Sequence, residues 1–294
     1  MQLKKNMKKH LTLLVAIIAT VGLAAVSCCE THRTMRISIF SDHIVTISRQ
    51  ENISFAEAAA RIEEIGFEGV DVRVSQKPEE IRTLDSLGFA HSCVITDIDF
   101  SKEDQKELED RTLAFMDEYG YDRLMLVAGF IPKEGFSQTE MDAARHRIAA
   151  FAARGAGKGY KIMVEDYDHE RSFTSNAARL DTLFSVSKDL GLVFDTGNFQ
   201  FSGEDAMEQF EHFRDKIGHL HLKDRASSTD LRCVPAGTGC IPIVEIIQKL
   251  KEDNYTGWLT IEQFGSRNML SDNETAYNII RAAIDQPRKR PAPM

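Results

Sequence analysis

The chain has 294 residues, of which 43% are hydrophobic and 28% are charged, and its formal net charge is −9. This length allows one large globular domain or two small ones, with enough apolar residues for a sizeable core. The acidic balance disfavours generic nucleic-acid binding, because such a surface repels phosphate backbones.

The N-terminus has the pattern of an export signal. Its first ten residues carry four lysines and no acid, and they precede the apolar run LTLLVAIIATVGLAAV over 11–26. This run is shorter than the roughly 20 residues that cross a bilayer, so we predict a signal peptide over 1–27, with an uncleaved anchor as the alternative. Loss of its four lysines would shift the net charge from −9 to −13.

Small residues precede Cys28 in the segment AVSC, which resembles a bacterial lipoprotein cleavage box. The box departs from the usual pattern at Ala25, where leucine is more common. We therefore expect lipidation of Cys28 and an exported protein, anchored to the membrane and facing the periplasm or the cell exterior.

After a linker over 28–34, strand-like runs alternate with amphipathic helical stretches about eight times. Ser54 and Glu57 have the spacing of a helix capping box. Four glycines are expected to end helices just before a strand: Gly66, Gly88, Gly120 and Gly191. The predicted strands cover 35–40, 69–74, 89–96, 123–129, 160–166, 191–195, 218–224 and 258–264.

Eight strand–helix repeats predict either a closed (β/α)8 TIM barrel or a doubly wound open sheet. The count favours the barrel, as does the absence of a G-x-G-x-x-G turn after the first predicted strand. We assign the barrel to 35–285 and expect the basic, proline-rich tail over 286–294 to be disordered.

The segment HLHLKD places His219, His221 and Lys223 on one face of a strand and two leucines on the other. In a parallel barrel the chemistry lies at the C-terminal ends of the strands. Four consecutive predicted strands each bring one candidate metal ligand to that end, in the order Glu165, Asp195, His221 and Glu262.

Taken singly, each of these residues has a simpler explanation as a solvated acid or a hydrogen-bonded core histidine. Three carboxylates and an imidazole in register are expensive to bury without a shared cation, so together they predict one divalent metal site. Oxygen ligands favour Mn²⁺ or Mg²⁺, with Co²⁺ or Zn²⁺ as alternatives.

These motifs, with the loop VPAGTGCIP, resemble the sugar phosphate isomerase/epimerase family of xylose-isomerase-like TIM barrels over about residues 34–285. The resemblance implies that Glu165, Asp195, His221 and Glu262 bind the metal and that the two glutamates also move a proton. It implies an isomerase or epimerase that converts a sugar, keto-sugar or cyclitol through an enediolate.

Other residues are weaker candidates for the site. Asn198, Lys223 and Arg232 are predicted to bind substrate, with salt bridges to Asp224 or Asp230 as the alternative for the two cations. His219 is expected one layer below the site, and a structural role is favoured for His43 and His91. Gly237 and Gly239 should let the loop turn close to the substrate. Asp166 and Asp168 depart from the asparagine and histidine that the family usually has, which leaves the substrate open.

Three other functions remain as alternatives. A lyase or hydrolase of keto-sugars or glycosides could use the same enolisation, and a non-catalytic sugar-binding lipoprotein could keep the barrel without the chemistry. An abasic-site endonuclease shares the barrel but needs more ligands, where this chain has Asn198 and the segment DLR over 230–232. A small carbohydrate is thus the expected partner, in free rather than phosphorylated form if the protein is exported.

Beyond Cys28 and Cys29 only three cysteines remain, namely Cys93, Cys233 and Cys240. Cys233 and Cys240 are close in sequence, so they could form one disulfide, or they could both be free, buried thiols. Family relatives are often dimers or tetramers, but no apolar stripe here identifies an interface, so a homo-oligomer stays open.

Overall fold

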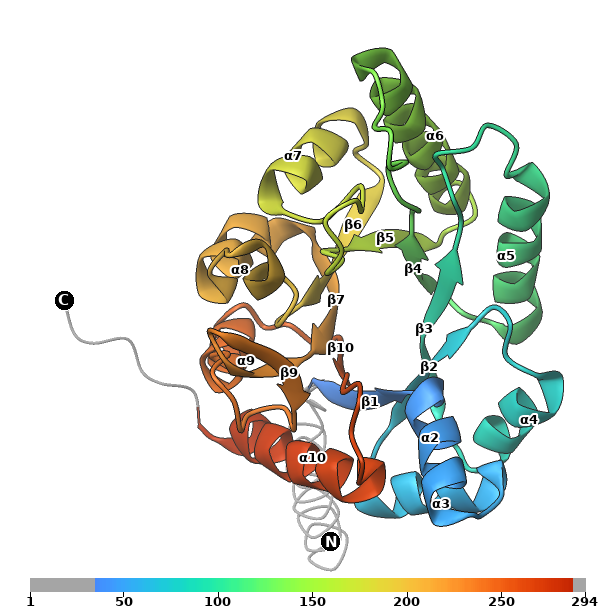
Figure 1. Cartoon of the computed structure of the whole chain (residues 1–294). Coiled ribbons are helices and arrows are strands. Elements are labelled where there is room, and N and C mark those ends of the chain that lie inside the picture. Colours follow the sequence, from blue (N-terminus) through green and yellow to red (C-terminus); the bar gives the residue numbers. More distant parts are fainter. Residues whose placement is uncertain (1–34, 288–294) are drawn as a thin grey trace, which may run out of the picture. The chain divides into compact units, whose positions relative to one another are not determined.

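Eight parallel strands close into a barrel in the computed structural model, which describes residues 35–287. Figure 1 looks along the barrel and shows the strands as an inner ring. The closed order is β1-β10-β7-β6-β5-β4-β3-β2, which confirms the predicted TIM barrel. The strands are β1 (Arg36–Phe40), β2 (Gly69–Arg73), β3 (Ala90–Asp97), β4 (Arg123–Val127), β5 (Lys161–Glu165), β6 (Leu190–Asp195), β7 (Ile217–Leu222) and β10 (Trp258–Ile261).

Helices wrap the outside of this ring (Figure 1). The predicted capping box is confirmed, because Ser54 and Glu57 each accept a hydrogen bond from the other's backbone N–H. The helices are α2 (Ser41–Glu51), α3 (Phe55–Ile65), α4 (Pro78–Ser86), α5 (Lys106–Tyr119), α6 (Gln138–Ala156), α7 (Ala177–Val186), α8 (Ala206–Phe213), α9 (Ile243–Glu252) and α10 (Met269–Asp285), with short 3-10 turns η1 (Phe199–Ser202) and η2 (Arg214–Lys216).

Alternation along the strands separates an apolar outer face from a mixed interior. On β7, Leu220 and Leu222 join the large core beneath the helices, while His219 and His221 are buried on the opposite, inward face. The interior is divided as well. One side is apolar, with Cys93, Met125, Met163 and Val193 in one cluster, and the other is polar, with Ser38, Asp71, His219 and Thr260 all fully buried.

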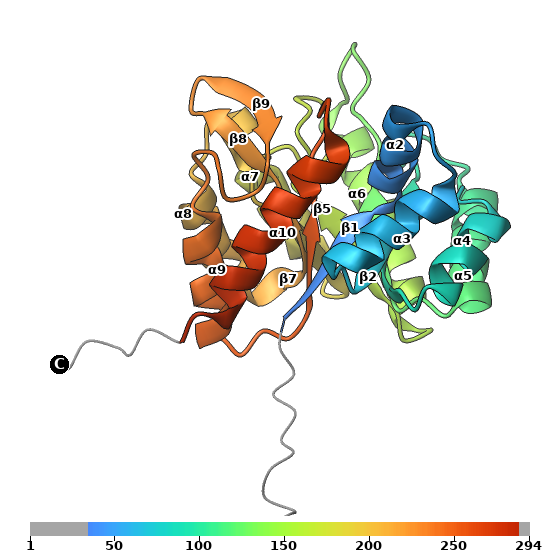
Figure 2. The ribbon, with the colours of Figure 1, turned by 90° about the horizontal axis from the view of Figure 1, so that it is seen from below.

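The chain leaves the barrel after β7 to form an antiparallel hairpin of β8 (Asp224–Ser227) and β9 (Asp230–Val234). Figure 2 shows this hairpin standing beyond one end of the barrel. The prediction of one strand over 218–224 missed the hairpin, because its short, polar strands lack an apolar alternation.

One of the four predicted glycine turns is wrong. Gly66, Gly88 and Gly120 have positive φ after α3, α4 and α5, as expected. Gly191 instead lies inside β6, and α7 ends earlier, at Val186. Its lack of a side chain matters for packing, since a Cβ there would lie 3.0 Å from Cγ of Met163.

The predicted signal over 1–27, the lipidation of Cys28, the linker over 28–34 and most of the predicted tail lie outside the described residues. Among residues 35–287, no helix combines the length and the apolar character that a membrane span requires.

Candidate metal and acid/base site

Four side chains from four neighbouring strands meet at the C-terminal end of the barrel. Glu165 ends β5, Asp195 ends β6, His221 lies near the end of β7, and Glu262 directly follows β10. Each offers one ligand atom, and these atoms all lie within 4.8 Å of one another. None of the four is more than 4% exposed. The strand register therefore brings together the four residues that the sequence selected as ligands.

His221 stands at the centre of this group. Its Nδ1 lies 2.6 Å from Oε1 of Glu165 and 3.0 Å from Oε2 of Glu262. Its Nε2 faces the other way, 3.2 Å from Oδ2 of Asp71. One ring nitrogen is thus directed at the carboxylates of the candidate site and the other at the barrel interior.

Lys223 lines the pocket and contacts two of the four candidate ligands. Its Nζ lies 2.5 Å from Oε1 of Glu262 and 3.0 Å from Oδ2 of Asp195, and it donates a hydrogen bond of 2.9 Å to Oδ1 of Asn198. The sequence left a salt bridge with Asp224 as the alternative for this lysine. The structure pairs it with two of the candidate ligands instead.

The surroundings push the pKa values of the two glutamates apart. Burial, and then the negative charge of Glu262, raise the pKa of Glu165. Burial would also raise the pKa of Glu262, but the charge of Lys223 and the contact with His221 outweigh it and lower that pKa. Two carboxyl groups with opposite shifts are the usual basis for separate acid and base roles.

Carboxylate oxygens without hydrogen bonds point into the group. Oδ2 of Asp195 and Oε2 of Glu262 are buried and accept no hydrogen bond from residues 35–287, although Nζ of Lys223 lies 3.0 Å from the first and Nδ1 of His221 lies 3.0 Å from the second. Burial raises the pKa of Asp195 well above its usual range. A buried set of three carboxylates and one imidazole nitrogen fits a divalent ion such as Mn²⁺ or Mg²⁺, whose charge would offset this cost.

A pocket of about 260 Å³ opens above these residues. Glu165, Glu262 and Lys223 line it together with three aromatic side chains, those of Phe40, Tyr167 and Phe264. Phe264 is 46% exposed, and its ring centre lies 5.7 Å from Nζ of Lys223. Aromatic walls with a few convergent polar groups are typical of a site for a small ligand.

Asn198 and Arg232, the other predicted substrate-binding residues, have different positions. Oδ1 of Asn198 accepts hydrogen bonds from both Lys223 and Arg225, so the amide holds two cations in place beside the site. The side chain of Arg232 is 79% exposed and forms a salt bridge with Asp230 on the hairpin. For Arg232 the structure shows the arrangement that the sequence left as the alternative.

Sequence reasoning missed two buried charged residues next to the site. Asp71 on β2 contacts His221 from below, and Arg225 on β8 donates to Asp168 and to the carbonyl of Gly197. Asp71 alternates with valines in GVDVRV, so its inward face could have been read from the sequence. Arg225 had no such signal, because its hairpin was not predicted.

A carboxylate anchors the glycine loop at the rim of the site. Asp224 accepts hydrogen bonds from the backbone N–H groups of Gly237, Gly239 and Ile241, and from that of Arg225. A Cβ at Gly239 would collide with the Arg225 carbonyl and with the Asp224 carboxylate. Position 239 therefore requires glycine, because the Asp224 carboxylate and the Arg225 carbonyl approach its backbone closely.

The other histidines considered in the sequence, namely His43, His91 and His219, have structural contacts. His219 lies one layer below the site, as predicted, where it bonds to Asp71 and Thr260. His91, at the start of β3 and so at the opposite end of the barrel, lies 2.7 Å from Asp85. His43 is buried beside the site, where burial lowers its pKa to about 4 and its Nε2 accepts from the N–H of Gln263.

Two acids that depart from the family pattern also have partners. Oδ1 of Asp166 accepts from the backbone N–H of Asp195 at 2.8 Å, and Asp168 forms the ion pair with Arg225. Both therefore support the strand ends and the hairpin that surround the candidate ligands.

All three described cysteines are free thiols, so Cys233 and Cys240 form no disulfide here. Cys93 is buried, Cys233 is half-buried beside Arg225, and Cys240 is exposed. The prediction of two free buried thiols is therefore right about their redox state but wrong about their burial.

The comparisons with known proteins agree with this fold. An inosose dehydratase of Clostridium botulinum (strain Alaska E43 / Type E3) is 26% identical over 245 residues, 71% of this chain and 82% of the relative. A probable 3-DHS dehydratase from Bacillus anthracis superposes with a TM-score of 0.69 at 20% identity, covering 84% of this chain and 99% of its own. An L-ribulose 3-epimerase gives 0.68 at 18% identity, covering 85% and 95%.

The family model described as xylose isomerase-like TIM barrel matches residues 59–285. This range includes all four candidate metal ligands and most of the barrel. The chain belongs to the xylose isomerase-like TIM barrel family.

Proposed function

We propose that the protein is a divalent-metal-dependent isomerase or epimerase of a keto-sugar or keto-cyclitol. The observation that carries this proposal is the convergence of Glu165 and Glu262, from strands on either side of β7, on Nδ1 of His221 at 2.6 and 3.0 Å. Two carboxyl groups with pKa values shifted in opposite directions at one point can remove a proton and return it elsewhere.

A divalent ion held by the four ligands would polarise a substrate carbonyl and make the neighbouring C–H more acidic. Lys223 contacts Glu262 and lowers its pKa, so Glu262 would be the carboxylate that takes this proton. Burial raises the pKa of Glu165 in the metal-free site, so Glu165 is the group that would return a proton to the opposite face of the carbon or to the adjacent carbon. The first outcome gives an epimer and the second an isomer.

A second candidate is water elimination, which the curated inosose dehydratases favour. The first step would be the same: Glu262 takes the proton next to the carbonyl. The neighbouring C–O bond would then break, and the ammonium group of Lys223 or the carboxyl group of Glu165 would supply the proton that lets hydroxide leave as water. Lys223 lines the pocket within reach of Glu262, as this role requires.

The pocket suits an uncharged substrate better than a phosphorylated one. Three cationic side chains line it, and each is already paired with a carboxylate: Arg73 with Asp42, Lys223 with Glu262, and Arg225 with Asp168. This agrees with the proposal that the protein is exported, since sugar phosphates are largely cytoplasmic. Finding the full-length chain, with its first 27 residues, in the cytoplasm would contradict the export proposal.

The test of the proposed function is proton exchange. The Mn²⁺-loaded protein is incubated in D2O with a panel of ketoses and keto-cyclitols, and products are analysed by mass spectrometry and NMR. We expect deuterium at the carbon next to the carbonyl of at least one substrate. A product with the same elemental composition as the substrate would indicate isomerisation or epimerisation, and a product that has lost one water would indicate elimination. Binding without exchange in the metal-loaded wild type would contradict catalysis and leave a sugar-binding protein.

A further inference from the structure

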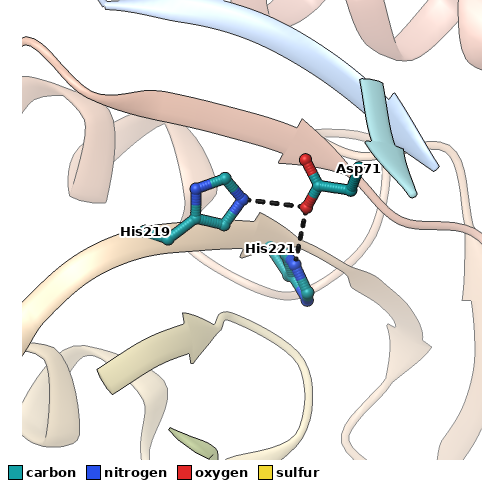
Figure 3. A group of neighbouring side chains, drawn as sticks. All are labelled: Asp71, His219 and His221. Carbon is teal, nitrogen blue, oxygen red and sulfur yellow. Dashed lines mark hydrogen bonds and ion pairs between the residues drawn. The ribbon is translucent and has the colours of Figure 1, made fainter. Parts of the chain in front are cut away.

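One carboxylate on β2 contacts two histidines of β7 below the candidate metal site. Oδ2 of Asp71 lies 2.9 Å from Nε2 of His219 and 3.2 Å from Nε2 of His221. Figure 3 shows both imidazole rings directed at this single oxygen. All three side chains are fully buried.

The other oxygen of this carboxylate is bound as well. Oδ1 of Asp71 accepts hydrogen bonds from Ser92 at 2.5 Å and from Thr260 at 3.1 Å. Asp71 therefore has two partners on each oxygen, which fixes its rotamer. Each of these four partners, two hydroxyl groups and two ring nitrogens, can donate a hydrogen bond, so Asp71 acts as the acceptor.

Asp71, His219 and His221 could themselves be taken for a second metal site, because their donor atoms lie within 4.8 Å of one another. The hydrogen bonds argue against this. Both oxygens of Asp71 are satisfied, whereas the candidate site above has carboxylate oxygens with no hydrogen bond. His221 faces this group only through Nε2, which is hydrogen-bonded to Asp71, whereas its Nδ1 faces the carboxylates of the candidate site.

We propose that Asp71 is a positioning residue for the metal site: it accepts the Nε2–H of His221 and thereby presents Nδ1 as the metal ligand. A neutral imidazole carries one N–H, so a carboxylate at Nε2 leaves the lone pair on Nδ1. Histidine ligands generally donate their second N–H to such a partner, and loss of the partner typically costs 10–100-fold in metal affinity or activity.

This inference rests on the proposed metal site but not on the reaction. It concerns β2, a strand that supplies none of the four candidate ligands. His219 supports the arrangement, because its own contact with Oδ2 holds the carboxylate under His221. The contact between Asp71 and His221 thus links β2 to β7, two strands that are separated in the barrel by β1 and β10.

The test compares Mn²⁺ affinity by calorimetry in the wild type, Asp71→Ala, Asp71→Asn and the control Ser92→Ala. Ser92 contacts Asp71 but has no hydrogen bond to His221. Asn retains one acceptor oxygen for the two histidines, but it loses the charge and places an NH2 group where Oδ1 accepts from Ser92 and Thr260. We expect Asp71→Ala to weaken binding about 10–100-fold, Asp71→Asn to weaken it less, and Ser92→Ala to stay within about 2-fold.

A second readout separates positioning from folding. In the Co²⁺-loaded protein, the Nε2–H of a coordinated histidine gives a shifted, exchangeable proton resonance. This proton should exchange with solvent faster in Asp71→Asn than in the wild type, which decides the question even if Asp71→Ala does not fold. Unchanged affinity and unchanged exchange in folded Asp71 variants would overturn the inference. A wild type that binds no metal would instead overturn the proposed function.

Discussion

Two polar layers lie one above the other inside the barrel, and they differ in how their hydrogen bonds are satisfied. In the lower layer, both oxygens of Asp71 are bonded, and the hydroxyls of Ser38 and Thr260 bond to each other at 2.6 Å. In the upper layer, buried oxygens of Asp195 and Glu262 accept no hydrogen bond from the described chain. Bonds to both of its oxygens hold Asp71 rigidly, although Nδ1 of His219 beside it has no hydrogen bond within residues 35–287. In the upper layer, carboxylate oxygens that have ion-pair partners but no hydrogen bonds from the described residues, and that are directed at one point, indicate a binding site.

The largest difference between the two layers is expected when one residue in each layer is substituted. Glu262→Gln should lower kcat by about 10²–10⁴-fold, because it removes the proposed base, while Ser38→Ala should leave kcat within a few-fold. The measurement is turnover of the substrate found by deuterium exchange, with Mn²⁺ in excess. Equal losses in the two variants would contradict the division into an active and a supporting layer.

A histidine at the edge of the upper layer gives a prediction on pH. Burial lowers the pKa of His43 from 6.5 to about 4, so the unfolded chain binds this proton more readily than the folded one. Its contribution to stability is present above pH 6.5 and is lost as pH falls toward 4, up to about 3 kcal/mol. Urea unfolding at pH 8, 6 and 4.5 should show less acid sensitivity in His43→Gln, and parallel wild-type and variant curves would contradict this.

The loop anchored by Asp224 at the rim of the site should need glycine at 239 because the chain packs closely there. Gly88 is the comparison, because it has free space around it. Gly239→Ala places a methyl group against the Asp224 anchor and should destabilise the protein by about 1–3 kcal/mol while raising KM. Gly88→Ala, at a turn with positive φ and no neighbour within 4 Å, should cost about 1–2 kcal/mol with KM unchanged. A raised KM in both variants would argue against a specific role for the loop.

The smallest effect is expected at Arg232. Because its side chain is exposed and paired only with Asp230, Arg232→Ala should leave kcat/KM within about 2-fold, as is usual for surface ion pairs. Lys223→Met, in the pocket, should by contrast lower kcat/KM strongly. A large loss in Arg232→Ala would restore the substrate-binding role predicted from the sequence.

The sequence predicted the barrel and the four candidate ligands because both depend on strand order and period. Glu165, Asp195 and His221 could be placed at strand ends once the repeats were counted. Features made by non-local contacts were harder to predict. The ring of contacts around Asp71 joins β2, β3, β7 and β10, and the hairpin that carries Arg225 has short, polar strands. For the same reason, the sequence could not decide between substrate binding and a salt bridge for Arg232.

The central claim is that Glu165, Asp195, His221 and Glu262 hold a single divalent ion. A crystal of the protein grown with Mn²⁺ and measured for anomalous scattering tests it directly. We predict one anomalous peak about 2.0–2.3 Å from an oxygen of each carboxylate and from Nδ1 of His221. A peak elsewhere, or no peak at these side chains at saturating Mn²⁺, would contradict the account.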